Sequence, residues 1–204
     1  MIIRAALSPL CEPLYRCADR SYDLADGHFI QHDMDDSEHP GGRAHLARHH
    51  LRRNLKQEKN LGEWKVGGPR PNGEVTLALK TMKLRMLRQG PRLYRKLPAP
   101  PTGRNRARIS YYMNPGLNLF GAAGSNLIGI WGFDREVEEV AIRIVRPVRA
   151  WRIGQYEKID IDFFLPRQGE ALDGMEFIPS DEDMTLPLPI EMEEGGEDAD
   201  GSSG

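Results

Sequence analysis

The sequence predicts an α+β protein: a small antiparallel β-meander at about residues 137–164, a basic helix at about 43–60, many loops and a disordered acidic C-terminal tail. Three observations lead to this prediction. Apolar side chains recur at helical spacing in one basic stretch, three short segments alternate apolar and polar side chains, and residues 168–204 hold 12 acids and no Lys or Arg. With 204 residues, 39% of them hydrophobic, and with 21 Gly and 15 Pro, one loop-rich domain with appendages is expected.

The N-terminal segment, residues 1–42, is acidic and contains several histidines. Pro9 and Pro13 interrupt its beginning, and the stretch from Ser21 to Gly42 is polar. Proline lacks the amide hydrogen that a helix interior uses, and a polar stretch without apolar periodicity is typical of a loop. We therefore expect short helical pieces joined by loops in this segment.

The basic helix is predicted from the residues that follow. Ala47, Leu51 and Leu55 recur every four residues between positions 43 and 59, which places them on one face of a helix. Basic side chains occupy most of the intervening positions. The result is a helix with a narrow apolar stripe and a broad cationic surface.

A strand is predicted at residues 74–87, with one irregularity. Val75, Leu77 and Leu79 alternate with small or polar residues, and the alternation resumes one position out of phase at Met82. Such a slip indicates either a β-bulge near Lys80 or a change into helix, and the pattern does not distinguish these. We expect the 74–87 strand to join the sheet of the meander.

The meander is the best-supported element of the prediction. Its three segments are rich in β-branched and aromatic residues, and the connections between them are two to five residues long, short enough for antiparallel neighbours. The expected strands are 140–145, 148–153 and 159–163.

Charge divides the chain into three segments. Residues 1–42 carry three Lys or Arg against eight Asp or Glu, whereas residues 43–108 carry 18 against three, a net charge of +15. We therefore expect an acidic, His-rich N-terminal segment at 1–42, a core domain with the basic helix and the β-structure at 43–166, and an acidic, largely disordered tail at 167–204.

The basic segment 43–108 indicates a polyanionic partner, with nucleic acid first and an acidic protein surface second. Guanidinium groups bind phosphates through paired hydrogen bonds, and each neutralised phosphate releases condensed counterions, so binding would be sensitive to salt. The contacts that we expect are Arg48, Arg52, Arg53, Lys56, Arg85, Arg88, Arg92 and Arg95. Five aromatic residues could add base stacking, with core packing as the alternative: Tyr94, Tyr111, Tyr112, Trp131 and Trp151.

A metal site is the second chemical hypothesis. All six histidines lie within 23 residues, interleaved with aspartates. His45 and His49 are four residues apart on the predicted helix, and His28 and His32 repeat that spacing, which is how one helix face presents two imidazoles to Zn²⁺. No HExxH or paired CxxC motif completes the set, so solvated histidines are the alternative and no cofactor beyond a possible zinc ion is expected.

Composition also excludes several classes of protein. No run of about 18 apolar residues is present, so a membrane partner is not expected. Cys11 and Cys17 alone make no disulfide framework, which favours a reducing compartment, cytoplasmic or otherwise intracellular. No serine lies in a GxSxG motif, and neither cysteine has a convincing nucleophile context, so a non-enzymatic role is favoured over an enzymatic one.

The sequence thus predicts a non-enzymatic binding or assembly protein that engages a polyanion, nucleic acid first, through residues 43–108. The acidic tail would compete for the same face. Two alternatives remain open: a metal-dependent hydrolase or nuclease that uses the histidines from His28 to His50, and a protein–protein interaction module of the kind found among viral or phage accessory and structural proteins.

Overall fold

The computed structural model of the chain describes residues 2–39, 41–69, 73–88, 98–102, 104–115, 125–134 and 138–172. Within these residues the protein is α+β, with helices and one mixed sheet. The helices are α1 (Ile2–Leu7), α2 (Cys11–Gln31), α3 (Gly42–Gln57) and α4 (Arg106–Tyr112). The strands are β1 (Lys65–Val66), β2 (Val75–Leu79), β3 (Met82–Arg88), β4 (Asn126–Asp134), β5 (Glu139–Pro147) and β6 (Ile159–Phe164).

The six described strands lie in the sheet in sequence order, from β1 to β6. Neighbours are antiparallel except β3 and β4, which run parallel with Lys83 opposite Asn126. The sheet is therefore mixed, whereas an antiparallel sheet was expected. Two parallel neighbours need a long crossover connection. Here the crossover is the chain between β3 and β4, which includes α4.

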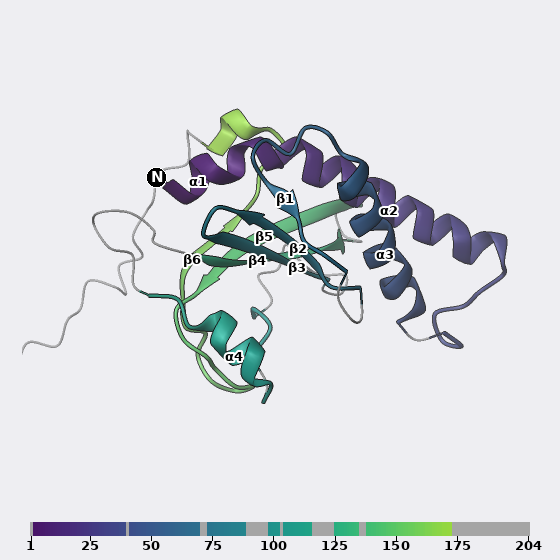
Figure 1. Cartoon of the computed structure of the whole chain (residues 1–204). Coiled ribbons are helices and arrows are strands. Elements are labelled where there is room, and N and C mark those ends of the chain that lie inside the picture. The colour runs from purple at the N-terminus through teal and green to yellow at the C-terminus, as the bar shows by residue number, and fades with distance from the viewer. Residues whose placement is uncertain are drawn as a thin grey trace, which may run out of the picture. The chain divides into compact units, whose positions relative to one another are not determined.

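Helices cover both faces of this sheet. Figure 1 shows α1 and α2 above the sheet, α3 at one end and α4 below it. The main core lies between the sheet and the first three helices. The apolar face of α3, formed by Ala47, Leu51 and Leu55, is completely buried there. A second cluster on the opposite face contains Tyr112 of α4 and Trp151.

The segment predicted as one irregular strand at 74–87 is a β-hairpin. Leu79 of β2 pairs directly with Met82 of β3, and the two-residue turn between them contains Lys80 in left-handed backbone conformation, with φ 52°. Both readings of the phase slip, a bulge and a helix, were wrong. A two-residue turn produces the same shift in the apolar alternation. Leu79 and Met82 are three positions apart but point to the same face of the sheet, because they are paired across the hairpin.

The meander prediction was correct for two strands and wrong for the third. β5 and β6 contain the predicted segments 140–145 and 159–163, but residues 148–153 form a loop. There the carbonyl oxygen of Trp151 accepts hydrogen bonds from the amide and the hydroxyl of Thr102, at 3.2 and 2.8 Å, instead of joining a strand ladder. β5 pairs directly with β6 and, on its other side, with β4, a strand that the sequence analysis missed.

Helix α2 corrects the prediction for the N-terminal segment, because it continues to Gln31 where loops were expected. Pro9 lies in a short 3₁₀ turn (Ser8–Leu10) and Pro13 lies in the first turn of α2, where a missing amide hydrogen costs nothing. Polar residues are also buried along α2. The amide of Asn54 on α3 donates a 2.9 Å hydrogen bond to the hydroxyl of Ser21, which itself donates to the carbonyl of Cys17.

The last described residues belong to the packed fold rather than to a tail. Arg167 pairs with Asp19 of α2 at 2.8 Å, and Leu172, at the end of a 3₁₀ turn called η4 (Gly169–Leu172), is buried. The tail predicted from residue 167 therefore begins too early. Residues 173–204, where the prediction of disorder falls, lie outside the described residues. Among the helices that the structure describes, none has both the length and the apolar character needed to cross a bilayer.

Candidate functional site

The outer surface of α3 carries a row of basic side chains. Leu51 and Leu55 are buried in the main core, where α3 packs chiefly against α2, so positions 49, 52, 53 and 56 lie on a different face of the helix. Their spacing i, i+3, i+4, i+7 aligns these four positions. Together with Gln57 they line a hollow of about 430 Å³. We call this group the α3 basic stripe: His49, Arg52, Arg53 and Lys56.

The α3 basic stripe holds cationic groups without anionic partners. Arg52 is half-buried, and its Nε and Nη2 atoms are shielded from solvent without a hydrogen-bond partner among the described residues. In that same part of the chain, no carboxylate forms an ion pair with Arg52, Arg53 or Lys56. An unsatisfied buried donor costs about 1–3 kcal/mol, so a change of the Arg52 rotamer that brought these donors to an anion would recover part of that cost.

Other arginines near the helices are already neutralised. Arg43 forms ion pairs with Asp26 and with Asp36, the second at 3.3 Å. Arg16 of α2 binds Glu58 at 3.0 Å, just beyond the end of α3. Among the described residues, most of the Arg and Lys side chains of α3 that form no ion pair therefore lie in the outer stripe, and Arg48 is the exception.

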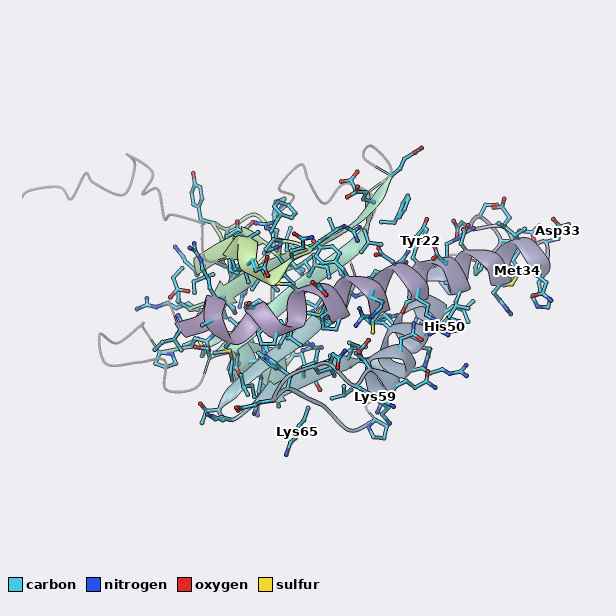
Figure 2. The ribbon with its side chains drawn as sticks, turned by 90° about the horizontal axis from the view of Figure 1, so that it is seen from above. Tyr22, Asp33, Met34, His50, Lys59 and Lys65 are labelled. Atoms are coloured by element: carbon cyan, nitrogen blue, oxygen red, sulfur yellow. The ribbon has the colours of Figure 1, made fainter. Side chains whose placement is uncertain are left out.

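The structure brings only some of the predicted contact residues together. Arg52, Arg53 and Lys56 share the stripe, whereas Arg48, one turn earlier, contacts the ring of His45 at 2.9 Å. Figure 2 shows α2 extending past α3, with His50 between these helices and Lys59 beyond the far end of α3.

Two predicted contacts lie on β3 instead. Arg85 and Arg88 are three residues apart, so their side chains leave opposite faces of the sheet. Arg85 pairs with Glu74 at 3.2 Å, and burial lowers the pKa of Arg88, whose Nε has no hydrogen-bond partner among the described residues. Neither residue lines the α3 hollow. The predicted contacts Arg92 and Arg95 lie outside the described residues.

The predicted metal ligands fall into two places. The rings of His28 on α2 and His32, the residue just after α2, are 4.4 Å apart, while His45 and His49 lie on exposed parts of α3. Across the described residues, no group of three or more His, Cys, Asp or Glu side chains is arranged to hold a metal ion. The structure therefore provides no ligand set for the predicted zinc ion in this part of the chain.

His50 on α3 has cationic neighbours. Burial lowers the pKa of His50, and the charges of Arg53, His28 and His49 lower it further. A cationic field of this kind favours anionic ligands and disfavours additional protonation.

The aromatic residues considered for base stacking are mostly core residues. Tyr112, Trp131 and Trp151 are 1, 1 and 3% exposed, and the phenol of Tyr111 is bonded to the carbonyl of Leu127 at 2.8 Å. Of the two roles considered for these four aromatic residues, core packing is therefore the correct one. Tyr94 lies outside the described residues. Among the large hydrophobic side chains that the structure describes, the exposed aromatic one is Tyr156, which the sequence analysis did not consider because no motif surrounds it.

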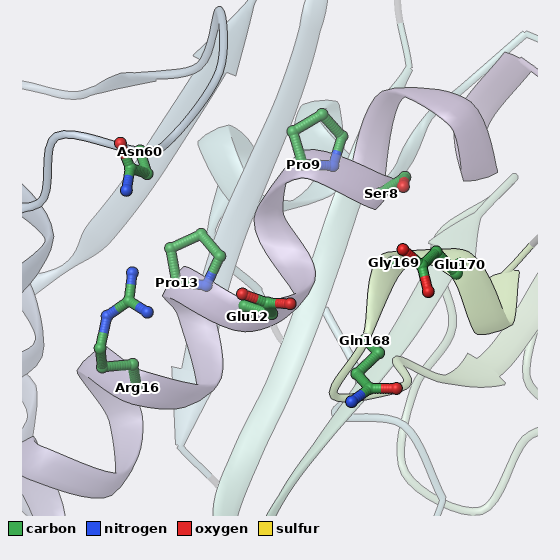
Figure 3. Close-up of a pocket in the computed structure, with 9 residues that line it drawn as sticks. All are labelled: Ser8, Pro9, Glu12, Pro13, Arg16, Asn60, Gln168, Gly169 and Glu170. Carbon is green, nitrogen blue, oxygen red and sulfur yellow. The ribbon is translucent and has the colours of Figure 1, made fainter.

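A second hollow, of about 540 Å³, lies where the start of α2 approaches η4 (Figure 3). Its lining has mixed charge, and its arginine is the one already paired with Glu58. This hollow therefore offers a weaker binding site for an anion than the α3 basic stripe does. The lining residues are Ser8, Pro9, Glu12, Pro13, Arg16, Asn60, Gln168, Gly169 and Glu170.

Comparisons of this chain with protein-family models, with curated proteins and with solved structures found no match. The charges, contacts and exposure of the chain's own residues therefore indicate its function.

Proposed function

We propose that this protein is a non-enzymatic binding or assembly protein that holds the phosphate backbone of nucleic acid in the α3 basic stripe. The observation that carries the proposal is the hollow lined by His49, Arg52, Arg53 and Lys56, where neither arginine nor the lysine forms an ion pair among the described residues. Phosphate oxygens are strong acceptors for such groups, and arginine binds them through two parallel hydrogen bonds.

The dimensions of the stripe fit a short length of backbone. From His49 to Lys56 a helix rises about 10 Å, at about 1.5 Å per residue. Nucleotides in one strand of B-DNA are spaced by about 3.4 Å along the axis, so the stripe spans about three of them. The contacts are to charge rather than to base edges, so this surface by itself would bind with little sequence preference.

Binding of a fluorescent DNA duplex across a salt series tests the proposal. We expect the double variant Arg53→Gln, Lys56→Gln to bind about tenfold more weakly than the natural protein, and the slope of log K against log salt to become shallower by about 2. Both side chains are exposed, so the variant should keep its fold.

A matched control removes two exposed charges elsewhere. Lys65 on β1 and Lys80 in the hairpin turn are exposed, and Lys80 only approaches Glu63 at 3.8 Å. The double variant Lys65→Gln, Lys80→Gln should change the affinity by less than about twofold, because these charges lie outside the stripe. Equal losses in the two variants, or no binding of the natural protein at low salt, would contradict the proposal.

A further inference from the structure

The loop between β5 and β6, residues 148–158, presents two large apolar side chains to solvent. Ile153 and Tyr156 are each 90% exposed, the highest fractions among the large hydrophobic side chains that the structure describes. Contiguous exposed apolar groups on a soluble surface commonly mark a binding site, so this loop requires an explanation.

The loop holds these side chains outward through a defined backbone. The amide of Gln155 donates to the carbonyl of Arg152 at 3.0 Å, and the side-chain oxygen of Gln155 accepts from the amide of Arg152 at 2.9 Å. Gly154 supplies the left-handed conformation of the turn, with φ 83°. At the base of the loop, the amide of Val148 donates to the carbonyl of Lys158 at 2.7 Å. A surface arranged in this way loses little conformational entropy when it binds.

A hollow of about 290 Å³ lies beside the turn. Trp151 forms part of its wall and packs against Tyr112 of α4, with ring centroids 5.0 Å apart. The lining combines apolar surface with hydrogen-bonding and cationic groups: Thr102, Arg104, Ile109, Ala150, Trp151, Arg152 and Gln155.

The surroundings of the turn are cationic. Within the described residues no carboxylate forms an ion pair with Arg104, Arg149, Arg152 or Lys158, and the acid of the loop is engaged elsewhere. That acid, Glu157, accepts a 2.7 Å hydrogen bond from the amide of Ala99 and lies 3.9 Å from Arg143. We use the name Tyr156 surface for residues that line this hollow together with exposed residues of the same loop. The lining residues are Arg104, Trp151, Arg152 and Gln155, and the exposed loop residues are Arg149, Ile153, Tyr156 and Lys158.

We propose that the Tyr156 surface binds single-stranded nucleic acid through its unpaired bases. One base would stack on the exposed ring of Tyr156, a neighbouring base would enter the hollow beside Trp151, and Arg149 and Arg152 would contact the intervening phosphates. This inference takes its ligand class from the proposed function but uses other residues: Trp151 belongs to the second core cluster, whereas α3 packs in the main core on the other face of the sheet.

The chemistry of the hollow favours a base over the other occupants. A duplex keeps its base faces stacked, so the ring of Tyr156 would have nothing to stack on. A lipid surface would use the apolar tip formed by Ile153 and Tyr156 but would have no use for a hollow with Thr102 and Gln155 in its wall. Unpaired bases can use both the ring of Tyr156 and the polar hollow, because each base has an aromatic face and a hydrogen-bonding edge.

The test compares two oligonucleotides of equal charge in the full-length protein. One is a fluorescent 12-residue oligothymidine, and the other is an abasic strand with the same number of phosphates. We expect the natural protein to bind oligothymidine about 5- to 100-fold more tightly, because stacking contributes for each base that is bound. Tyr156→Ala should remove most of this preference and change the affinity for the abasic strand by less than about twofold.

Two further variants at the same position define the mechanism. Tyr156→Phe should retain the preference for bases, since it keeps an aromatic face, whereas Tyr156→Leu should lose it although it keeps an apolar side chain. Equal affinity of the natural protein for both strands, an unchanged preference in Tyr156→Ala, or binding to phosphatidylserine vesicles in place of oligothymidine would overturn the proposal.

Failure here is distinguishable from failure of the α3 proposal. Arg53→Gln, Lys56→Gln should weaken the binding of both strands by the same factor, because it removes phosphate contacts only. One outcome would support the α3 proposal and overturn the proposal for the Tyr156 surface. In that outcome the natural protein binds the two strands equally, and the Arg53→Gln, Lys56→Gln variant binds neither. If the natural protein binds neither strand nor inorganic polyphosphate at low salt, both proposals are overturned.

Discussion

The phenol of Tyr15 on α2 donates a 2.6 Å hydrogen bond to the carbonyl oxygen of Leu165, which is 150 residues away in the sequence. The same phenol oxygen accepts a hydrogen bond from the amide of Ile142 in β5 at 3.3 Å. The guanidinium of Arg167 lies 4.5 Å from the centre of the Tyr15 ring. One side chain therefore connects the first long helix with the final two strands of the sheet.

Tyr15→Phe should lower the free energy of unfolding by about 1–3 kcal/mol, because the buried carbonyl of Leu165 loses its donor. Urea denaturation measures this loss. Tyr22→Phe is the matched control, since Tyr22 stacks on Phe133 at 4.4 Å and its phenol makes no hydrogen bond within the described residues. The control should change stability by less than about 0.5 kcal/mol. Equal unfolding midpoints for both variants would show that the Tyr15 phenol does not hold the helix to the sheet.

The same substitution at two glycines should have opposite effects. A Cβ at Gly169 would lie 2.6 Å from the hydroxyl and 2.8 Å from the carbonyl oxygen of Ser8, so Gly169→Ala should destabilise the protein by about 1–3 kcal/mol. A Cβ at Gly27, within α2, would meet nothing within 4 Å, so Gly27→Ala should stabilise the protein by up to about 1 kcal/mol. Thermal unfolding of both variants checks the prediction, and destabilisation by Gly27→Ala would refute the second half of it.

His50 should make stability fall as the pH is lowered. Its pKa is lowered in the folded protein by burial and by neighbouring positive charges, whereas in the unfolded chain it titrates near about 6.5. Between the two pKa values the unfolded state binds more protons than the folded state. The contribution of His50 to the free energy of unfolding is therefore fully present above the unfolded pKa, and it is lost as the pH falls from about 6.5 to the folded pKa.

Urea denaturation between pH 5 and pH 8 measures this dependence. His50→Gln, which cannot be protonated, should show a weaker loss of stability on acidification than the natural protein. The control is His39→Gln, an exposed histidine for which the dependence should stay unchanged. Parallel stability curves for the natural protein and His50→Gln would contradict the prediction.

Removal of the acidic tail should strengthen nucleic-acid binding. Residues 175–204 carry most of the acids of the C-terminal segment and no Lys or Arg, so their removal takes away a competing anion. The truncation belongs after Gly174, because Leu172 is buried and Gly169 approaches Ser8 closely.

The truncated protein should bind DNA several-fold more tightly at low salt, and this advantage should shrink as salt rises, since screening weakens the competition. An unchanged thermal midpoint is the control for folding. Equal or weaker binding after truncation would show that the tail does not compete.

The sequence by itself determined the elements that have a local pattern. The four-residue spacing of Ala47, Leu51 and Leu55 indicated the buried face of α3, and β-branched alternation located β5 and β6. Segregation of charge along the chain is likewise a property of the sequence alone. These features depend on neighbouring residues, so they can be read without knowledge of the fold.

Tertiary structure decided which side chains remain available to a ligand. Arg16 and Arg85 are neutralised by acids distant along the sequence or across a hairpin, whereas Arg52 and Arg53 form no ion pair within the described structure. Trp151 is buried and Tyr156 is exposed, although no local pattern separates the two. Pairing and exposure depend on contacts between segments far apart in the chain, and those contacts exist only once the helices have packed on the sheet.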